Sequence, residues 1–191
     1  MRSVAEVTGA WWSVALRGVV ALVAAVVVAV TPIPHVENLL RVFGAYLLID
    51  GLIDLVAAAR AAKARRPWYR PLGQGLLGVL VGLANLVGAG LPAPVRMDII
   101  ALRIGIQGAS IVAGTWERRA VFPATLPMWP LLLWGSASML FSVLVVLDLA
   151  VQAPLLGNLE WLACLYLVGF GVLLLALAER LRRLSWFHGD M

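Results

Sequence analysis

Residues 12–30 read WSVALRGVVALVAAVVVAV and residues 39–59 read LLRVFGAYLLIDGLIDLVAAA, with the turn TPIP at residues 31–34 between them. Each stretch has about the 20 mostly apolar residues that an α-helix needs to cross the hydrocarbon core of a bilayer. Proline lacks the backbone donor that would continue the first helix through the turn. The two stretches therefore predict a pair of transmembrane helices that form a hairpin.

Further along the chain, four more stretches have the same length and apolar character. The third and fifth spans are again followed by proline-bearing breaks. The first span is expected to be retained and not cleaved as a signal peptide, because Arg17 interrupts it and no small-residue cleavage site follows before Pro32. The four additional spans are residues 72–91, 98–116, 129–151 and 159–178.

The overall composition agrees with a membrane protein. The chain has 191 residues, of which 62% are hydrophobic and 13% charged, whereas soluble domains are about 45–50% apolar and about 25% charged. Because a water-soluble fold of this size has no room to hide so much apolar surface, the lipid bilayer is expected to surround most of it. We expect residues 1–191 to form a single integral membrane domain.

Basic residues predict the orientation of the spans, because lysine and arginine accumulate in cytoplasmic loops. Eleven of the fifteen basic residues lie on one predicted side, which places both termini in the cytoplasm of a multi-pass protein of the bacterial inner membrane. The net charge of +5 is thus assigned to topology and not to nucleic-acid binding. These residues are Arg2, Arg60, Lys63, Arg65, Arg66, Arg70, Arg118, Arg119, Arg180, Arg182 and Arg183.

An internal repeat of roughly 60 residues, with units at about 10–63, 66–119 and 127–184, is visible in the sequence. Each unit begins with tryptophan, continues to a first glycine and a proline-bearing turn, and ends with a second glycine: Gly51, Gly108 or Gly171. Because every unit starts and ends on the same side, the repeats are parallel and not inverted. The predicted fold class is an all-α membrane protein with six transmembrane helices as three parallel helix-hairpin repeats.

This layout resembles the HdeD family of small bacterial inner-membrane proteins that are linked to acid resistance. The resemblance rests on the tryptophan-to-glycine start of each hairpin, the central proline turn, and the segment GAYLLIDGLIDLVAAAR at residues 44–60. It spans about residues 10 to 184, and it weakens in the second and third units. It implies the fold and a role in acid or envelope stress, and it implies no catalytic residues.

Charged residues inside predicted spans are the candidates for a functional site, because each costs about 2.5–3.5 kcal/mol at the centre of a membrane helix. Arg17 and Asp54 lie at nearly the same depth on adjacent antiparallel helices, which predicts an ion pair. Asp50 lies one turn deeper on the same face as Asp54. Arg103 has a long side chain that is expected to reach Asp50. The candidate intramembrane polar cluster is therefore Arg17, Asp50, Asp54 and Arg103.

Two interpretations of this cluster remain open at the level of sequence. The ion pairs either fix the register of the helices, or they form a proton-responsive or transport-related site.

A further intramembrane charge, Asp148, lies near the outer end of the fifth span, where Arg41 or Arg96 is expected to reach it.

Glycine spacing indicates close helix packing, since Gly75, Gly78 and Gly82 line one helix stripe. This stripe serves packing within the monomer or a homo-oligomer. Motifs typical of hydrolases and metalloenzymes, and the Walker loop, are absent from the sequence. The segment GQGLLG at residues 73–78 matches the dinucleotide pattern GxGxxG, but it follows no predicted strand and lies in a predicted span, so we reject it. We therefore expect a non-enzymatic protein without catalytic residues, metal, cofactor or known small-molecule ligand. The alternatives are a small transporter or channel that uses the cluster of the first repeat, and a membrane scaffold or assembly partner.

Overall fold

The computed structural model describes residues 11–30, 36–65, 67–88, 90–118, 129–151 and 159–187, and these residues form six α-helices without strands. All six are long and apolar enough to cross a membrane, which confirms the predicted all-α fold with six spans. The helices are α2 (Trp11–Val30), α3 (Val36–Lys63), α4 (Tyr69–Val87), α5 (Ala93–Arg118), α6 (Trp129–Val151) and α7 (Leu159–Phe187).

The helix ends follow from local chemistry. The apolar pattern predicts a third span that reaches residue 91, but α4 ends at Val87 because Gly88 has a φ of 75° and caps it in the left-handed conformation. Glycine adopts this conformation without the steric cost that a Cβ imposes. In contrast, α3 continues to Lys63 and α7 to Phe187, since charged residues past the apolar segment are good helix formers once they reach the membrane surface.

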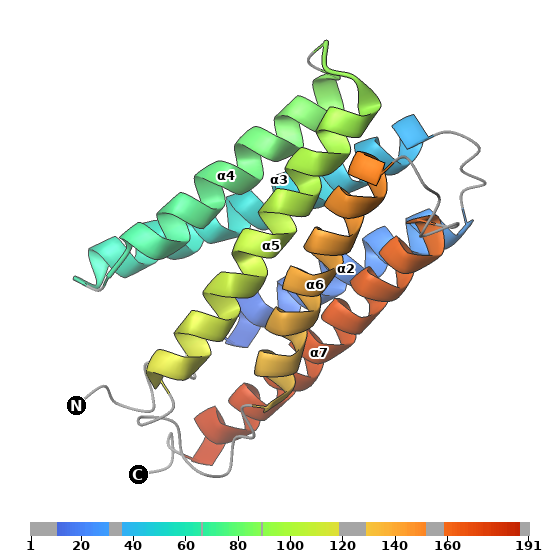
Figure 1. Cartoon of the computed structure of the whole chain (residues 1–191). Coiled ribbons are helices and arrows are strands. Elements are labelled where there is room, and N and C mark those ends of the chain that lie inside the picture. The colour runs from blue at the N-terminus through green and yellow to red at the C-terminus, as the bar shows by residue number, and fades with distance from the viewer. Residues whose placement is uncertain are drawn as a thin grey trace.

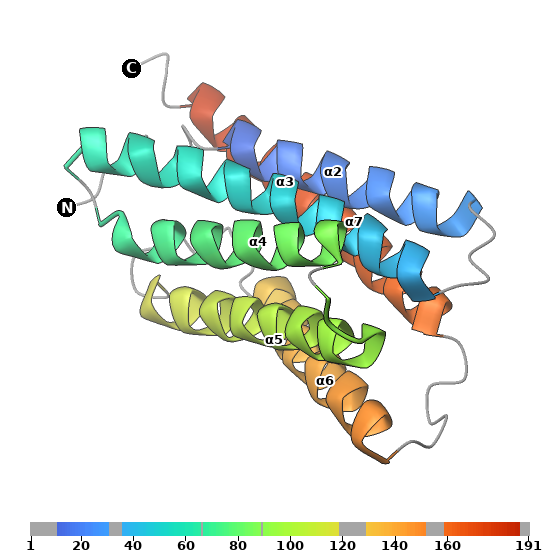
Figure 2. The same cartoon turned by 90° about the horizontal axis from the view of Figure 1, so that it is seen from above.

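The six helices form a bundle of elongated, roughly aligned rods (Figures 1 and 2). The most closely packed pairs are α3 with α4, α5 with α6, and α2 with α7. Each of these pairs joins the second helix of one predicted repeat unit to the first helix of another. The start of α2, the end of α7 and the α3–α4 connection lie at the same end of the bundle. We call this the basic end, after Lys63, Arg65 and Arg70; the side of the membrane that it faces remains a prediction.

Glycines allow these three pairs to approach closely. A Cβ added to Gly51 would lie 2.8 Å from the carbonyl oxygen of Gly75, and one added to Gly108 would lie 2.6 Å from that of Gly135. A Cβ on Gly171 would likewise lie 2.9 Å from the carbonyl oxygen of Gly18. Small residues let membrane helices pack backbone against backbone. The same kind of crossing thus occurs three times, although superposition of the three units remains a prediction.

The interior of the bundle is filled mainly by side chains of α3, α5 and α7. Leu47, Ile104 and Leu167 are buried on these three helices at positions that correspond in the predicted repeat. In this core, Tyr166 of α7 contacts two aromatic rings of α6, with its ring centroid 5.2 Å from those of both Trp134 and Phe141. This apolar interior is the setting in which the intramembrane charges must be accommodated.

Adding one methyl group tests the glycine crossings. We expect Gly82→Ala to lower the thermal unfolding midpoint in detergent, because the new Cβ would lie 2.6 Å from the backbone nitrogen of Leu48. Such overpacking costs about 1–3 kcal/mol. Gly73→Ala on the same helix is the matched control, because no described atom lies within 4 Å of its Cβ position. Equal unfolding midpoints for the two variants would contradict the tight α3–α4 crossing.

Candidate functional site

The centre of the candidate site is Asp50 on α3, whose residue surface is only 1% exposed. Its Oδ1 lies 3.6 Å from Nε of Arg17 on α2, and its Oδ2 lies 3.7 Å from Nη2 of Arg103 on α5. These distances are within the range of an ion pair. Neither carboxylate oxygen accepts a hydrogen bond from the described residues. Asp50 therefore lies between two guanidinium groups from two other helices.

Arg17 also forms the ion pair with Asp54 that the sequence predicts. Its Nη2 donates a hydrogen bond to Oδ1 of Asp54. Asp54 lies one helical turn from Asp50, so both carboxylates project from the same face of α3. The structure thus brings all four predicted residues together, with two positive and two negative formal charges. This balance matters because an uncompensated charge in hydrocarbon is costly.

Arg103 connects the cluster to α4 as well. Its side chain is buried, and Nη1 donates a hydrogen bond to Oε1 of Gln107 at 3.1 Å. Its Nη2 lies 3.4 Å from the backbone oxygen of Gln74, to which it donates. The guanidinium therefore contacts side chains or backbone of α3, α4 and α5. In the sequence, Gln74 and Gln107 stand at the positions of Arg17 and Asp50 in the second repeat.

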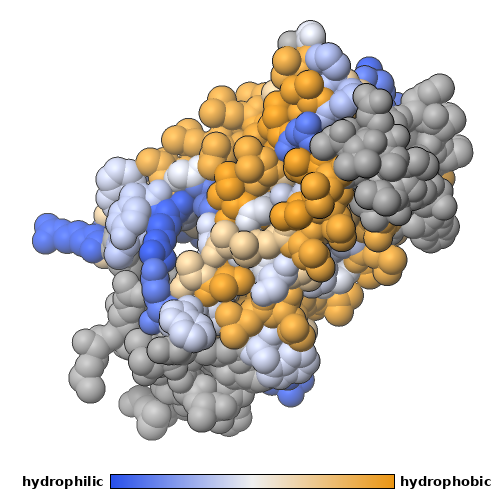
Figure 3. Space-filling model, in the orientation of Figure 1, coloured by the Kyte–Doolittle hydropathy of each residue, from blue (hydrophilic) through white to orange (hydrophobic). Residues whose placement is uncertain are grey.

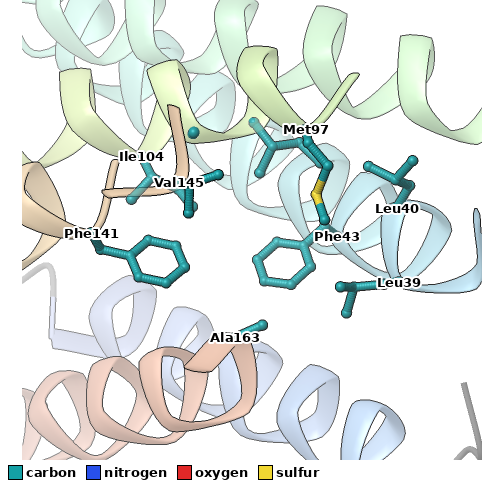
Figure 4. A pocket seen from close by; sticks show the side chains of 10 residues that line it. Leu39, Leu40, Phe43, Met97, Ile104, Phe141, Val145 and Ala163 are labelled. Carbon is teal, nitrogen blue, oxygen red and sulfur yellow. The ribbon is translucent and has the colours of Figure 1, made fainter. Parts of the chain in front are cut away.

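Next to the cluster, on the side away from the basic end, the interior between α3, α5, α6 and α7 is apolar. A cavity of about 30 Å³ lies there between α3, α5, α6 and α7, and the rings of Phe43 and Phe141 face it from opposite sides (Figure 4). It is large enough for water, but its lining offers no polar partner, and such cavities stay dry. The lining residues are Leu39, Leu40, Phe43, Met97, Ile100, Ala101, Ile104, Phe141, Val145 and Ala163.

A second buried arginine is not recognisable as a site residue from the sequence. Arg96 is 3% exposed, donates a hydrogen bond to Glu37 of α3, and has its Nη1 3.5 Å from the backbone oxygen of Asn85. It thus ties α3, α4 and α5 together near the end opposite the basic end. The predicted contact of Arg41 or Arg96 with Asp148 cannot be compared, since the side chain of Asp148 lies outside the described residues.

The charge balance of the cluster leads to a specific expectation for stability. Arg17→Leu leaves two carboxylates with one arginine, and Asp54→Leu leaves two arginines with one carboxylate. Each single variant should lower the free energy of unfolding by about 3–5 kcal/mol, the cost of breaking a buried ion pair. The double variant retains Asp50 with Arg103 and should recover much of the loss. Thermal unfolding in detergent measures all three variants, and strictly additive losses would show that the residues do not couple.

Comparison with known proteins supports the repeat character of the first part of the chain. Residues 16–87 match the model of a family described as a short repeat of unknown function, DUF308. This segment runs from α2 to the end of α4 and contains Arg17, Asp50 and Asp54 but not Arg103. No curated protein and no solved structure gives a significant match. The chain is therefore a six-helix, membrane-type protein with a segment similar to the DUF308 repeat.

Proposed function

We propose that the chain is a non-enzymatic, HdeD-like protein of the bacterial inner membrane that acts in acid or envelope stress. Two observations support the proposal: six helices have the length and composition of membrane spans, and residues 16–87 match the DUF308 repeat, which members of the HdeD family carry. The predicted orientation, with both termini in the cytoplasm, is part of the proposal.

The four-charge cluster is the observation that carries a mechanism. Arg17, Asp50, Asp54 and Arg103 are formally neutral together, and they join α2, α3 and α5. Uptake of one proton by either carboxylate would leave one guanidinium uncompensated in the apolar interior. Because an unpaired buried charge is strongly unfavourable, this event would favour a different helix arrangement. The cluster thus has the composition that a proton-responsive switch requires.

The apolar cavity argues against the transporter alternative. A path for protons or polar solutes through the bundle requires polar groups on both sides of the cluster. On the side away from the basic end, the described interior around the cavity is lined by apolar side chains. We therefore propose that proton uptake by the cluster changes the helix packing of this protein, or of a partner protein in contact with it. The proposed mechanism involves no flux of solute through the bundle.

Survival at low pH tests this function. Deletion of the gene should reduce survival, and the wild-type chain should restore it. Asp50→Asn, which leaves two arginines with one carboxylate, should fail to restore survival at equal membrane abundance. Glu179→Gln is the matched control, since Glu179 is a partly exposed acid that pairs with Arg182 and Arg183 outside the cluster; it should restore survival fully.

Two outcomes would overturn the proposal. Unchanged survival of the deletion strain at low pH would remove the stress role, and full complementation by Asp50→Asn would remove the cluster from it. Proton flux through vesicles that contain the purified wild-type protein, absent with Asp50→Asn, would support the transporter alternative instead.

A further inference from the structure

A row of polar residues lies along the interface of α4 and α5 and extends from the basic end to the buried cluster. On α5 the members are spaced three or four residues apart, so they share one helix face. On α4 the two members lie one turn apart. The row consists of Glu117, Ser110, Gln107 and Arg103 on α5, with Gly114 at the position between Glu117 and Ser110, and of Arg70 and Gln74 on α4.

Polar contacts cross from one helix to the other at three levels. Nη1 and Nη2 of Arg70 each donate a hydrogen bond to a carboxylate oxygen of Glu117 at 2.7 Å. Farther in, Nε2 of Gln74 donates to Oγ of Ser110 at 2.7 Å. The third level is the contact of Arg103 with the backbone oxygen of Gln74. The two helices pack less closely than α3 with α4 or α5 with α6, and side-chain hydrogen bonds connect them at the first two of these levels.

The solvent exposure of the side chains decreases along this row towards the middle of the bundle. The side chains of Arg70 and Glu117 are 53% and 54% exposed, Ser110 is exposed, Gln107 is half-buried, and Arg103 is buried. Figure 3 shows a hydrophilic stripe at the place where Figure 1 shows the halves of α4 and α5 nearest the basic end. Over Gly114 the groove is open, since no described atom lies within 4 Å of its Cβ position.

The inner end of the groove contains buried polar atoms that make no hydrogen bond with the described residues, although the carboxylate of Asp50 is ion-paired. Oε1 of Gln74, Nε of Arg103 and both carboxylate oxygens of Asp50 make no hydrogen bond with the described residues. Buried polar groups in membrane proteins are almost always satisfied, because an unsatisfied group costs several kcal/mol in a hydrocarbon environment. Water, which both donates and accepts hydrogen bonds, fits a site that presents acceptors and a donor side by side.

The groove spans roughly two thirds of the hydrocarbon core of a membrane. Arg103 precedes Glu117 by 14 residues, which is about 21 Å along a helix axis, compared with a hydrocarbon core of about 30 Å. Beyond Arg103 towards the opposite end, Ile100 and Met97 of α5 line the apolar cavity, which separates the cluster from the buried Arg96 and its partner Glu37. A polar path is thus present on one side of Asp50 and an apolar barrier on the other.

We propose that the groove between α4 and α5 is a one-sided aqueous access path that brings water, and protons with it, from the basic end to Asp50. The path is closed towards the opposite end by the apolar side chains around the cavity. This inference rests on the geometry of α4 and α5, and it holds whether or not the protein acts in acid stress.

Cysteine accessibility tests the path directly. In a Cys164→Ala background, Ser110→Cys and Gln107→Cys are each treated with a membrane-impermeant thiosulfonate in right-side-out and inside-out vesicles. Ala64→Cys, in the connection at the basic end, identifies the side that this end faces. We expect both groove cysteines to react from the same side as Ala64→Cys, with Gln107→Cys slower. Leu102→Cys, on a 60% exposed residue of the lipid-facing side of α5, should react from neither side.

A plug variant adds a second readout. Gly114→Leu places a side chain in the open part of the groove, and it should slow labelling of Gln107→Cys at least tenfold while leaving the rate of Ala64→Cys unchanged. Ala109→Leu adds a similar volume on another, exposed face of α5 and should leave the rate unchanged. Failure of Gln107→Cys and Ser110→Cys to react while Ala64→Cys reacts would overturn the proposal. Equal reaction from both sides would overturn it as well, because it would show a continuous channel.

Discussion

The cost of placing charge in hydrocarbon is the constraint on which this structure depends. Arg17, Asp50, Asp54 and Arg103 share one site, where two guanidinium groups and two carboxylates compensate one another. Each of these charges alone would disfavour insertion of its helix. Because the compensating groups come from α2, α3 and α5, the bundle must bring those three helices together before all four charges are satisfied.

The remaining contacts divide the bundle into regions of different character. Lipid tails are as apolar as leucine, so helices in a membrane associate through close packing and hydrogen bonds. Glycine crossings provide the close packing for α3 with α4, for α5 with α6 and for α2 with α7. Between α4 and α5, polar side chains provide contacts instead, on the side of the basic end. One consequence is a cluster with polar surroundings on one side and apolar surroundings on the other.

Much of this fold could be predicted from the sequence, because span length and proline breaks set the number of helices and their order. The pair of Arg17 with Asp54 was predictable for a related reason: helical rise fixes the depth of a residue along the membrane normal. Depth does not determine which helices are neighbours around the bundle. The sequence therefore did not predict that the tightest pairs join different repeat units, nor the contact of Arg96 with Glu37.

The groove between α4 and α5 shows the same limit. Gln74, Gln107 and Ser110 are visible in the sequence as polar residues that dilute apolar spans, but the direction in which each faces depends on packing with neighbouring helices. Their convergence on Arg103 follows from the crossing of α4 with α3 at glycine and from the looser contact of α4 with α5. A spacing of three and four residues on α5 was the only sequence signal of a shared polar face.

The most direct test of charge compensation in the cluster compares two double variants that share one substitution. Arg17→Gln with Asp50→Asn keeps the cluster formally neutral, whereas Arg17→Gln with Arg103→Gln leaves two carboxylates without an arginine. Thermal unfolding in detergent should show the first double variant to be more stable than Arg17→Gln alone, and the second to be less stable. If both double variants instead show the sum of their single losses, the four residues do not act as a charge-compensated unit, and charge compensation does not explain why they lie together.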